Sequence, residues 1–451
     1  MNELYNILKG HANEKGLPIM DNPTFEKYTN EYSIKLFRET LAEYISKERP
    51  AFPFNNISSK KMETDFWKLF NYNVKKHVRS KDDVEREVIE KYDDYKYNFK
   101  EHGLGIIDAP SICGAASNYF MQKLRLSCGS YGYKSPVDVW ENGTAKEIWR
   151  CFGPIWRGIN DVQKDENGKI SGGYLQENSY LSAFRLGTYI ATQFKPVVAK
   201  CIYDMTYATK VLDTSCGWGD RLCGFYASNA EEYIGCDPNP STYEIYQEQC
   251  RAYEKILGYK DDPIIQVTPI KFVSKGKKTV TIYRCGAEDL PWDEINEVDC
   301  AFTSPPYFAT EEYNKGGEHE EDQSWFKFNE YEKWRNMFYI PVSKNSFDSL
   351  SAKGHLLINI LDPKVKGTRY RSGDELVDSM EEHFKGQIGM RIMQRPQGKT
   401  VFSDEDGKFD KDAMDEYMNK IYIENIWYFT KNKDQNIFDY SAKSDLTSYF
   451  T

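Results

Sequence analysis

Short apolar stretches alternate with stretches of helical periodicity through the second half of the chain. The apolar runs predict strands at residues 210–213, 232–237, 278–284, 298–302, 354–360, 389–393 and 422–429. Helical periodicity fills much of the sequence between them, most clearly at residues 240–256 and 328–350. Strands that alternate with helices form a parallel sheet with both faces covered, so we predict an α/β fold.

The first part of the chain has a different pattern. Residues 1–50 and 60–97 mix aromatic and charged residues at helical spacing, which predicts a mainly α-helical segment. The polar, glycine-rich stretch at residues 163–173 indicates a linker. A chain of 451 residues is long for a single core. We therefore expect two domains, a mainly helical one at residues 1–165 and an α/β one at residues 166–451.

Two glycines follow the first predicted strand. Gly217 and Gly219 lie between the strand that ends at Asp213 and a helical run at residues 221–227. Glycines at such a turn let a ligand approach the backbone at a helix start. The next strand ends at Asp237, about twenty positions on, where a carboxylate can accept hydrogen bonds from a ribose. The turn has fewer glycines than the dinucleotide fingerprint, so NAD binding is not favoured.

A Ser-Pro-Pro-Tyr motif at residues 304–307 follows the strand at 298–302. The prolines cannot donate to a sheet ladder, so the motif ends the strand and presents a rigid row of carbonyls. Carbonyls beside the Tyr307 ring suit a planar ring that bears an amine. Glu288 and Asp289 follow another strand, and the carboxyl ends of parallel strands meet at one sheet edge. We expect these groups to line one crevice.

In this order, the motifs resemble those of the S-adenosylmethionine-dependent amino-methyltransferases of DNA. The resemblance spans residues 170–430 and implies the Rossmann-like class I methyltransferase fold: a seven-stranded sheet with helices on both faces and its last two strands antiparallel. The glycine turn precedes the Ser-Pro-Pro-Tyr motif, which is the permutation with the cofactor half first. In that family a segment upstream of the glycine strand packs over the methionine part of the cofactor, and residues 176–185 occupy the corresponding place.

The resemblance also implies the role of each matched residue. The implied catalytic residues are Ser304, Pro305, Pro306 and Tyr307. The implied cofactor-binding residues are Asp213, Cys216, Gly217, Gly219, Asp237, Glu288, Asp289 and Thr303. Among them, Asp237 is expected to hold the ribose hydroxyls and Asp289 to accept from the adenine amine. Asp213 is expected to shape the glycine turn.

The implied reaction transfers a methyl group to the exocyclic amine of a base flipped out of DNA, in a restriction-modification setting. In the family, Ser-Pro-Pro-Tyr is associated with N4 of cytosine, whereas motifs that begin with Asp or Asn are commoner for N6 of adenine. Most serine-type members carry the two halves in the reverse order. We favour N4 of cytosine over N6 of adenine, and both bases remain open.

Charge is distributed unevenly along the chain. The formal net charge is −10, which argues against a general nucleic-acid coat protein. Residues 75–81 and 364–371 are nevertheless basic clusters. Such clusters are most often solvated surface. The second follows a predicted strand of the catalytic sheet, so a contact with DNA phosphates is an expectation for it.

The composition of the sequence bears on the cellular location of the protein and on whether it binds a metal or forms disulfides. The sequence lacks a membrane-length apolar run and a signal-peptide pattern at its start, so we expect a soluble, cytoplasmic protein. The ten cysteines form no Cys-x-x-Cys pair and suit buried reduced thiols. With only six scattered histidines, we expect no metal site.

Two alternatives stay open. The same fold could act on RNA, a nucleotide or a protein amide, which the acidic overall charge allows. The chain could also be a non-catalytic DNA-binding or assembly subunit, although a relic has no physical need for the full set of motif residues. In either DNA reading, residues 1–165 are the candidate for target recognition, by elimination.

Overall fold

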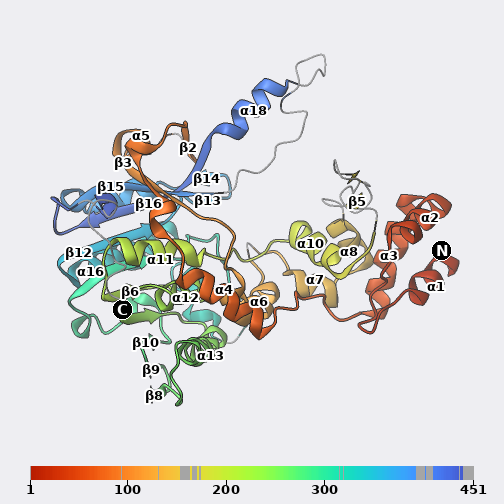
Figure 1. Ribbon diagram of the computed structural model, residues 1–451, viewed down its shortest axis with the longest axis horizontal. Coiled ribbons are helices and arrows are strands. Elements are labelled where there is room, and N and C mark those ends of the chain that lie inside the picture. Colours follow the sequence, from red (N-terminus) through yellow and green to blue (C-terminus); the bar gives the residue numbers. More distant parts are fainter. Residues whose placement is uncertain are drawn as a thin grey trace. The chain divides into compact units, whose positions relative to one another are not determined.

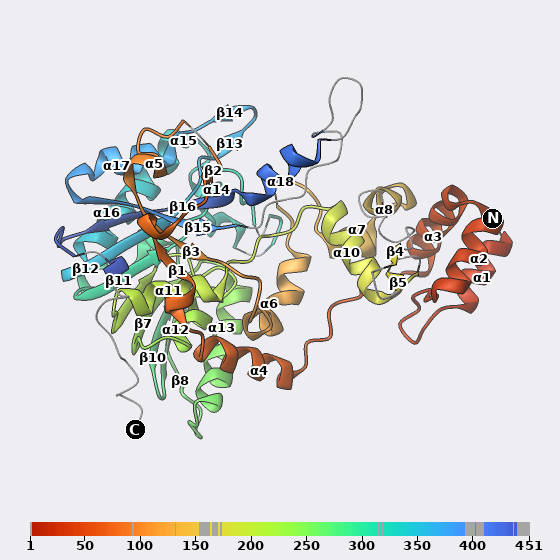
Figure 2. The same cartoon turned by 45° about the horizontal axis from the view of Figure 1, so that its top comes forward.

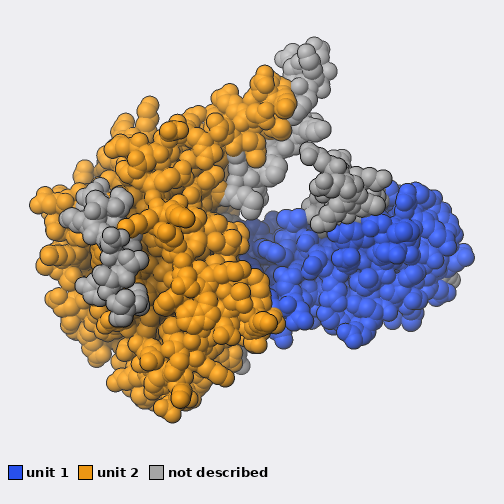
Figure 3. Space-filling model, in the orientation of Figure 1, with its two compact units in different colours: residues 1–57, 122–192, 311–317 blue, residues 58–121, 193–310, 318–451 orange. Residues whose placement is uncertain are grey.

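The computed structural model describes residues 2–92, 94–130, 132–152, 163–164, 170–171, 174–313, 315–317, 319–392, 402, 410–435 and 437–439 (Figure 1). The chain divides into two compact units, coloured in Figure 3. Unit 1 comprises residues 1–57, 122–192 and 311–317, and unit 2 comprises residues 58–121, 193–310 and 318–451. Because both units are discontinuous in sequence, the division differs from the single boundary expected at residue 165. The expected linker at 163–173 lies largely outside the described residues.

Unit 1 is built from helices around one apolar core. Its helices are α1 (Asn2–Gly10), α2 (Asn22–Tyr32), α3 (Ile34–Glu48), α7 (Pro136–Asn142), α8 (Ala145–Phe152) and α10 (Glu177–Gly187), with a short hairpin of β4 (Gln163–Lys164) and β5 (Ile170–Ser171). Helix α6 (Ala115–Ser127) begins in unit 2 and ends in unit 1. The core packs Trp140 against Phe52 and Phe184, and the buried Trp140 Nε1 donates to the Pro50 carbonyl at 2.6 Å.

Unit 2 contains a twelve-stranded mixed sheet. Its strands are β1 (Val78–Ser80), β2 (Val88–Glu90), β3 (Gly103–Asp108), β6 (Lys210–Asp213), β7 (Glu232–Cys236), β8 (Ile264–Thr268), β9 (Lys271–Lys275), β10 (Thr279–Tyr283), β11 (Val298–Thr303), β12 (Leu350–Asn359), β15 (Phe384–Arg391) and β16 (Ile421–Thr430). A separate hairpin pairs β13 (Lys364–Val365) with β14 (Thr368–Arg369).

Seven of these strands form the core of the sheet in the order β10-β7-β6-β11-β12-β16-β15. Strands β10, β7, β6, β11 and β12 are parallel, and β16 runs antiparallel to both of its neighbours. This is the strand order and direction of the class I methyltransferase fold. The predicted α/β fold is therefore confirmed, including the antiparallel pairing of the last two strands.

The other five strands extend the sheet beyond the predicted seven. The hairpin of β8 and β9 continues it past β10, whereas β3 and β1 continue it past β15, and β2 pairs with β16. The helical prediction for residues 60–97 therefore holds for α4 (Ser59–Phe70) but is wrong for β1 and β2. Pairing with distant strands decides their conformation there, since a three-residue strand carries little preference of its own.

Helices cover both faces of the sheet (Figure 2). On one face lie α11 (Pro196–Met205), α12 (Asp220–Tyr226) and α13 (Pro240–Ile256), with α4 packed on α11 and α12. The other face carries α17 (Ser372–Ser379) and a continuous helix made of α15 (Tyr331–Lys333), the π-helical η6 (Trp334–Tyr339) and α16 (Ile340–Asp348). The buried side chains of η6 and α16 share one apolar cluster with those of β11, β12 and β16.

Shorter helical elements complete unit 2. The remaining α-helices are α5 (Phe99–His102), α14 (Ser324–Lys327) and α18 (Lys411–Asn419). Single 3₁₀ turns occur at η1 (Val74–Lys76), η2 (Lys81–Asp83), η3 (Ala287–Asp289), η4 (Trp292–Glu294), η5 (Glu320–Asp322), η7 (Glu381–His383) and η9 (Ile437–Asp439). Within the described part of the chain, no helix has the length and apolar character needed to span a membrane.

Candidate active site

The glycine turn connects the end of β6 to the start of α12. Gly217 and Gly219 both adopt left-handed backbone conformations, with φ of 55° and 69°. Side chains with a Cβ rarely adopt these angles, so the turn requires glycine at both positions. A Cβ at Gly219 would also lie 2.1 Å from Gln249 Oε1. A Cβ at Gly217 would come no closer than 3.6 Å to another atom, so this part of the turn is sterically open.

Asp213 holds this turn from inside. Its carboxylate is fully buried and accepts from Arg221 Nε at 2.9 Å and from the Tyr233 hydroxyl at 2.7 Å through Oδ2. The other oxygen accepts from the Ser215 backbone N–H at 3.1 Å. Protein donors thus engage both oxygens, which agrees with the expected role of Asp213 in shaping the turn.

Asp237 follows β7 and faces the same turn. One carboxylate oxygen accepts from the Gly217 backbone N–H at 2.9 Å, and the other accepts from the Asn239 backbone N–H at 3.0 Å and from the Thr242 hydroxyl at 3.3 Å. Desolvation raises the pKa of Asp237 to about 6, although these backbone hydrogen bonds favour the charged form. The carboxylate is therefore rigidly placed and mostly ionised at neutral pH.

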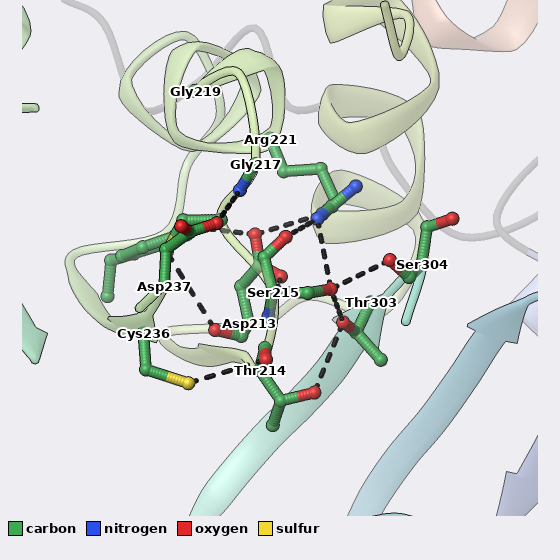
Figure 4. Close-up of polar contacts among 12 residues, drawn as sticks. Asp213, Thr214, Ser215, Gly217, Gly219, Arg221, Cys236, Asp237, Thr303 and Ser304 are labelled. Atoms are coloured by element: carbon green, nitrogen blue, oxygen red, sulfur yellow. Dashed lines mark hydrogen bonds and ion pairs between the residues drawn. The ribbon is translucent and has the colours of Figure 1, made fainter. Parts of the chain in front are cut away.

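Hydroxyl groups join the glycine turn to the Ser-Pro-Pro-Tyr motif (Figure 4). The Ser215 and Thr303 hydroxyl oxygens lie 2.6 Å apart, and the Thr214 hydroxyl donates to Thr303 Oγ1 at 3.2 Å. The Ser215 hydroxyl also lies 2.8 Å from the Ser304 backbone carbonyl, which accepts from it. Arg221 donates to the Ser215 backbone carbonyl. Two motifs that are 89 residues apart in sequence are therefore part of one hydrogen-bonded unit.

Three of the residues in this network were missed from the sequence: Thr214, Ser215 and Arg221. The sequence carried only a weak signal for them: two hydroxyl residues directly follow the end of β6, and an arginine lies two positions after Gly219. Strands β6 and β11 are hydrogen-bonded neighbours through Val211 and Leu212, which aligns the two strand ends. Thr303, which the resemblance assigned to the cofactor site, is buried and belongs to this network.

The Ser-Pro-Pro-Tyr motif itself leaves polar and aromatic groups at the end of β11. Ser304 and Tyr307 are both partly exposed, whereas Pro305 is buried. Among the described residues, the Ser304 hydroxyl has no hydrogen-bond partner. The Ser304 carbonyl is engaged by Ser215, so the serine hydroxyl and the Pro305 carbonyl are the acceptors left to consider. Pro306 is also partly exposed.

A cluster of aromatic side chains packs against the Ser-Pro-Pro-Tyr motif. Tyr307 packs against the apolar cluster that contains its buried neighbour Phe308. The Phe308 ring contacts the rings of Tyr331, Trp334 and Tyr370 at centroid distances of 5.4, 6.0 and 5.5 Å. These contacts fix the backbone of residues 304–308, so the partly exposed ring at Tyr307 is held on a rigid base.

The acidic loop after β10 carries Glu288 and Asp289. Both carboxylates contact Lys327 Nζ, at 2.8 and 3.0 Å. The Asp289 side chain is 59% exposed, whereas that of Glu288 is only 16% exposed. Glu288 Oε2 is buried and has no hydrogen-bond partner among the described residues. A buried carboxylate oxygen of this kind can accept from a ligand donor.

Cys216 contributes through its backbone. Its N–H donates to the Cys236 carbonyl at 2.9 Å, and its buried thiol lies 3.5 Å from the Tyr233 hydroxyl. Desolvation raises the pKa of the Cys216 thiol well above its usual value. The neutral thiol points into the protein, so its place in the turn is structural. Eight of the ten cysteines are buried, and Cys128 and Cys285 are partly exposed.

The segment expected over the methionine part of the cofactor belongs to unit 1, and its role at the cofactor stays a prediction. Residues 176–185 lie in α10, whose Tyr180 and Phe184 are buried in the core of unit 1. In unit 2, Gln193 and Phe194 contact the two residues that directly follow the glycine turn. Gln193 Nε2 donates to Asp220 Oδ1 at 2.8 Å, and the Phe194 ring lies 5.3 Å from the Arg221 guanidinium. The predicted helical pattern of residues 176–185 is confirmed by α10, and one side of this helix lies in the core of unit 1.

The two arginines of the basic cluster at residues 364–371 are ion-paired within unit 2, whereas Lys364 and Lys366 are exposed. Arg369 and Arg371 both pair with Asp94, the latter at 2.6 Å. Arg369 Nε also lies 3.7 Å from the buried Asp362. These arginines connect the β13–β14 hairpin and the residues that follow it to Asp94, so the expected phosphate contact would have to compete with their carboxylate partners. Within the described residues, no group of three His, Cys, Asp or Glu is arranged to hold a metal ion.

The arrangement fits a nucleoside-bearing ligand. The open glycine turn, the fixed Asp237 carboxylate and the unpaired Glu288 oxygen follow β6, β7 and β10, three adjacent strands of one sheet. In open α/β sheets, ligands bind outside the carboxyl ends of the strands, where the strand order reverses. That reversal falls between β6 and β11, the two strand ends that the hydroxyl network joins.

Comparison with protein-family models and with curated protein sequences finds no match. Solved structures are similar only at low identity. They include Trm1 from Pyrococcus horikoshii with S-adenosyl-L-methionine (15% identity, 38% of each chain covered, TM-score 0.26). The N-terminal domain of EvdMO1 with SAH bound matches at 10% identity over 63% of this chain and 96% of that one, with a TM-score of 0.28. The [4+2]-cyclase SpnF matches at 13% identity over 44% and 63%, also with a TM-score of 0.28.

These similarities are too distant to assign a family or an activity. The fold class rests on the strand order and directions of the sheet in unit 2. Within that fold, the chemistry depends on the residues at the strand ends.

Proposed function

We propose that the protein is an S-adenosylmethionine-dependent methyltransferase that modifies the exocyclic amine of a base flipped out of DNA, with N4 of cytosine favoured over N6 of adenine. The observation that carries the proposal is the hydroxyl network between Ser215 and Thr303. It holds the turn suited to the cofactor beside the motif suited to the amine. A transfer reaction requires its two reactants to be held together in this way.

Each group has a role in this proposal. When bound, S-adenosylmethionine supplies an electrophilic methyl group. The Asp237 carboxylate accepts from ribose hydroxyls, Glu288 Oε2 accepts from a further donor of the nucleoside, and the glycine turn leaves room for the methionine part. The exposed Asp289 is the expected acceptor for the adenine amine and would exchange its contact with Lys327 for it.

The substrate amine is a weak nucleophile because its lone pair is delocalised into the base. The Ser304 hydroxyl and the Pro305 carbonyl accept its hydrogens, which favours a tetrahedral nitrogen and stabilises the positive charge that develops during attack. Flipping the base costs a few kcal/mol, and stacking on Tyr307 offsets about 1–3 kcal/mol of it. No covalent intermediate is needed, which agrees with the buried, neutral thiol at Cys216.

The product of the reaction tests the proposal directly. We expect label from methyl-labelled S-adenosylmethionine to appear in mixed-sequence duplex DNA as N4-methylcytosine when the digested nucleosides are resolved by mass. If N6-methyladenine appeared instead, the order of the two motifs would predict the target base better than the serine of Ser-Pro-Pro-Tyr does. Cofactor binding without label in DNA, but with label in RNA or protein, would move the proposal to those substrates. Failure to bind the cofactor would favour a non-catalytic subunit.

Cofactor binding should depend on pH through Asp237. Its pKa of about 6 lies above the usual value, so the carboxylate is charged above pH 6 and becomes protonated below it. We expect the affinity for S-adenosylmethionine to be constant between pH 7 and 8 and to fall as the pH drops from 6.5 to 5, as measured by calorimetry. The Asp237→Asn variant should bind weakly with a flat profile over this range. If the affinity of the Asp237→Asn variant fell with pH in the same way as that of the wild type, the pH dependence would belong to another group.

A further inference from the structure

One face of α4 is exposed and combines lysines with an aromatic ring and one carboxylate, that of Glu63. Lys60, Thr64, Trp67, Lys68 and Asn71 follow one another at three- or four-residue steps or are adjacent, so they lie on one side of the helix. All five are exposed, and Trp67 retains 37% of its surface area. We call this set the α4 stripe.

The opposite side of α4 explains why the stripe faces solvent. Met62, Phe66 and Leu69 are buried, and the Phe66 ring stacks on Tyr253 of α13 with centroids 5.1 Å apart. This side anchors the helix to unit 2. The Trp67 ring contacts the Phe66 and Phe70 rings at centroid distances of 5.8 and 5.3 Å, and Trp67 still leaves 37% of its surface exposed.

The sequence around the stripe is strongly basic in an acidic protein. Residues 58–81 contain seven Lys or Arg and only two Asp or Glu, whereas the whole chain has a formal net charge of −10. Beyond the stripe, Lys75 and Lys76 in η1 are also exposed. Like charges gathered against the overall balance repel one another, and they suit a polyanion that neutralises them.

Hydrogen bonds tie α4 to the candidate active site within unit 2. Asp65 on the buried side of α4 accepts from the Ala115 backbone N–H at 3.3 Å. Two residues further on, the Ser117 hydroxyl donates to Asp220 Oδ1 at 2.5 Å. Asp220 directly follows Gly219 at the start of α12. The stripe therefore lies on a helix whose position is fixed relative to the glycine turn.

We propose that the α4 stripe, together with Lys76, is a docking surface for the sugar-phosphate backbone of duplex DNA. The lysines act as point charges for phosphates, and the Trp67 ring packs against deoxyribose. Contacts of this kind carry no sequence information and would position the duplex for the base to enter the active site. The inference rests on the proposed function, because it takes DNA as the substrate.

The test compares two triple variants with the same change in net charge. Lys60→Gln, Lys68→Gln and Lys76→Gln remove the proposed phosphate contacts. Lys333→Gln, Lys344→Gln and Lys353→Gln are the control, because these three lysines are exposed on α15, α16 and β12. Binding of a labelled duplex of mixed sequence is measured by fluorescence anisotropy from 50 to 200 mM salt, and binding of S-adenosylmethionine is measured in parallel.

For the stripe variant, we expect the slope of log Kobs against log salt concentration to become shallower by about 2.7, since each phosphate contact contributes about 0.9. The control variant should keep the wild-type slope, and cofactor affinity should not change in either. Trp67→Ala should raise Kd and leave the slope unchanged, because it removes an uncharged contact and no phosphate contact.

Other outcomes separate this inference from the proposed function. If the wild type binds and methylates duplex DNA but the two triple variants behave alike, the docking surface is overturned while the proposed function stands. If the wild type binds the cofactor but no duplex, both are overturned. If the stripe variant loses binding to RNA but the wild type ignores duplex DNA, the partner assigned to the stripe is wrong.

Discussion

Replacing Arg221 by leucine is expected to lower the free energy of unfolding of unit 2 by about 3–5 kcal/mol, as measured by urea titration. Arg221 is 5% exposed and donates to the fully buried Asp213 carboxylate at 2.9 Å. Its loss leaves that charge buried with only the Tyr233 hydroxyl and one backbone N–H as partners. An uncompensated buried charge is among the most destabilising changes that a single substitution makes.

Two controls accompany this variant. Arg251→Leu breaks the Arg251–Asp262 pair, whose side chains are 44% and 60% exposed, and should cost less than about 1 kcal/mol. Adding Asp213→Asn to Arg221→Leu removes the orphaned charge and should restore part of the loss. If the double variant were less stable than Arg221→Leu alone, the hydrogen bonds that the Asp213 carboxylate accepts would be the main interaction that stabilises the turn.

Replacing Tyr307 by alanine is expected to lower turnover on DNA by about 10- to 100-fold, with the Kd for S-adenosylmethionine changed less than twofold. The expected loss is the stacking of the flipped base, worth about 1–3 kcal/mol. Single-turnover transfer of labelled methyl to duplex DNA measures the first quantity and calorimetry the second.

Tyr307→Phe is the matched control, because it keeps the ring and removes only the hydroxyl. It should stay within a few fold of the wild type. A loss of cofactor binding in Tyr307→Ala would mean that the ring mainly supports the apolar cluster around Phe308. Equal losses in both variants would transfer the role to the hydroxyl.

The sequence predicted helices and strands correctly where the local hydrophobic pattern matches the burial of the side chains. The predicted strand at residues 210–213 is β6, and the predicted helix at 240–256 is α13. Fully buried parallel strands leave continuous apolar runs, and glycines with positive φ mark the turn between them. The same signals located Asp237 and the Ser-Pro-Pro-Tyr motif at strand ends. They could not locate Ser215, because a hydroxyl beside a strand end has no distinctive spacing.

Long-range pairing was harder to predict from the sequence. Strands β1 and β2 contain three residues each, and their conformation depends on β3 and β16. The division into units was hard to predict for a similar reason, since unit 1 gathers three segments that are far apart in sequence. Amphipathic periodicity predicted the helix α10 correctly, but it reports only that a helix face is buried and does not identify the core that buries it.

The late completion of the sheet has a consequence for synthesis of the chain on the ribosome. Asn425 of β16 donates to Glu90 of β2, a partner 335 residues earlier. At about 5–20 residues per second, β2 emerges roughly 20–70 s before β16 exists. During that time β2 and β3 lack their neighbours in β15 and β16, and unpaired strand edges invite association between chains. Having only three residues in β2 limits that hazard, because a short edge is a poor template for another nascent chain.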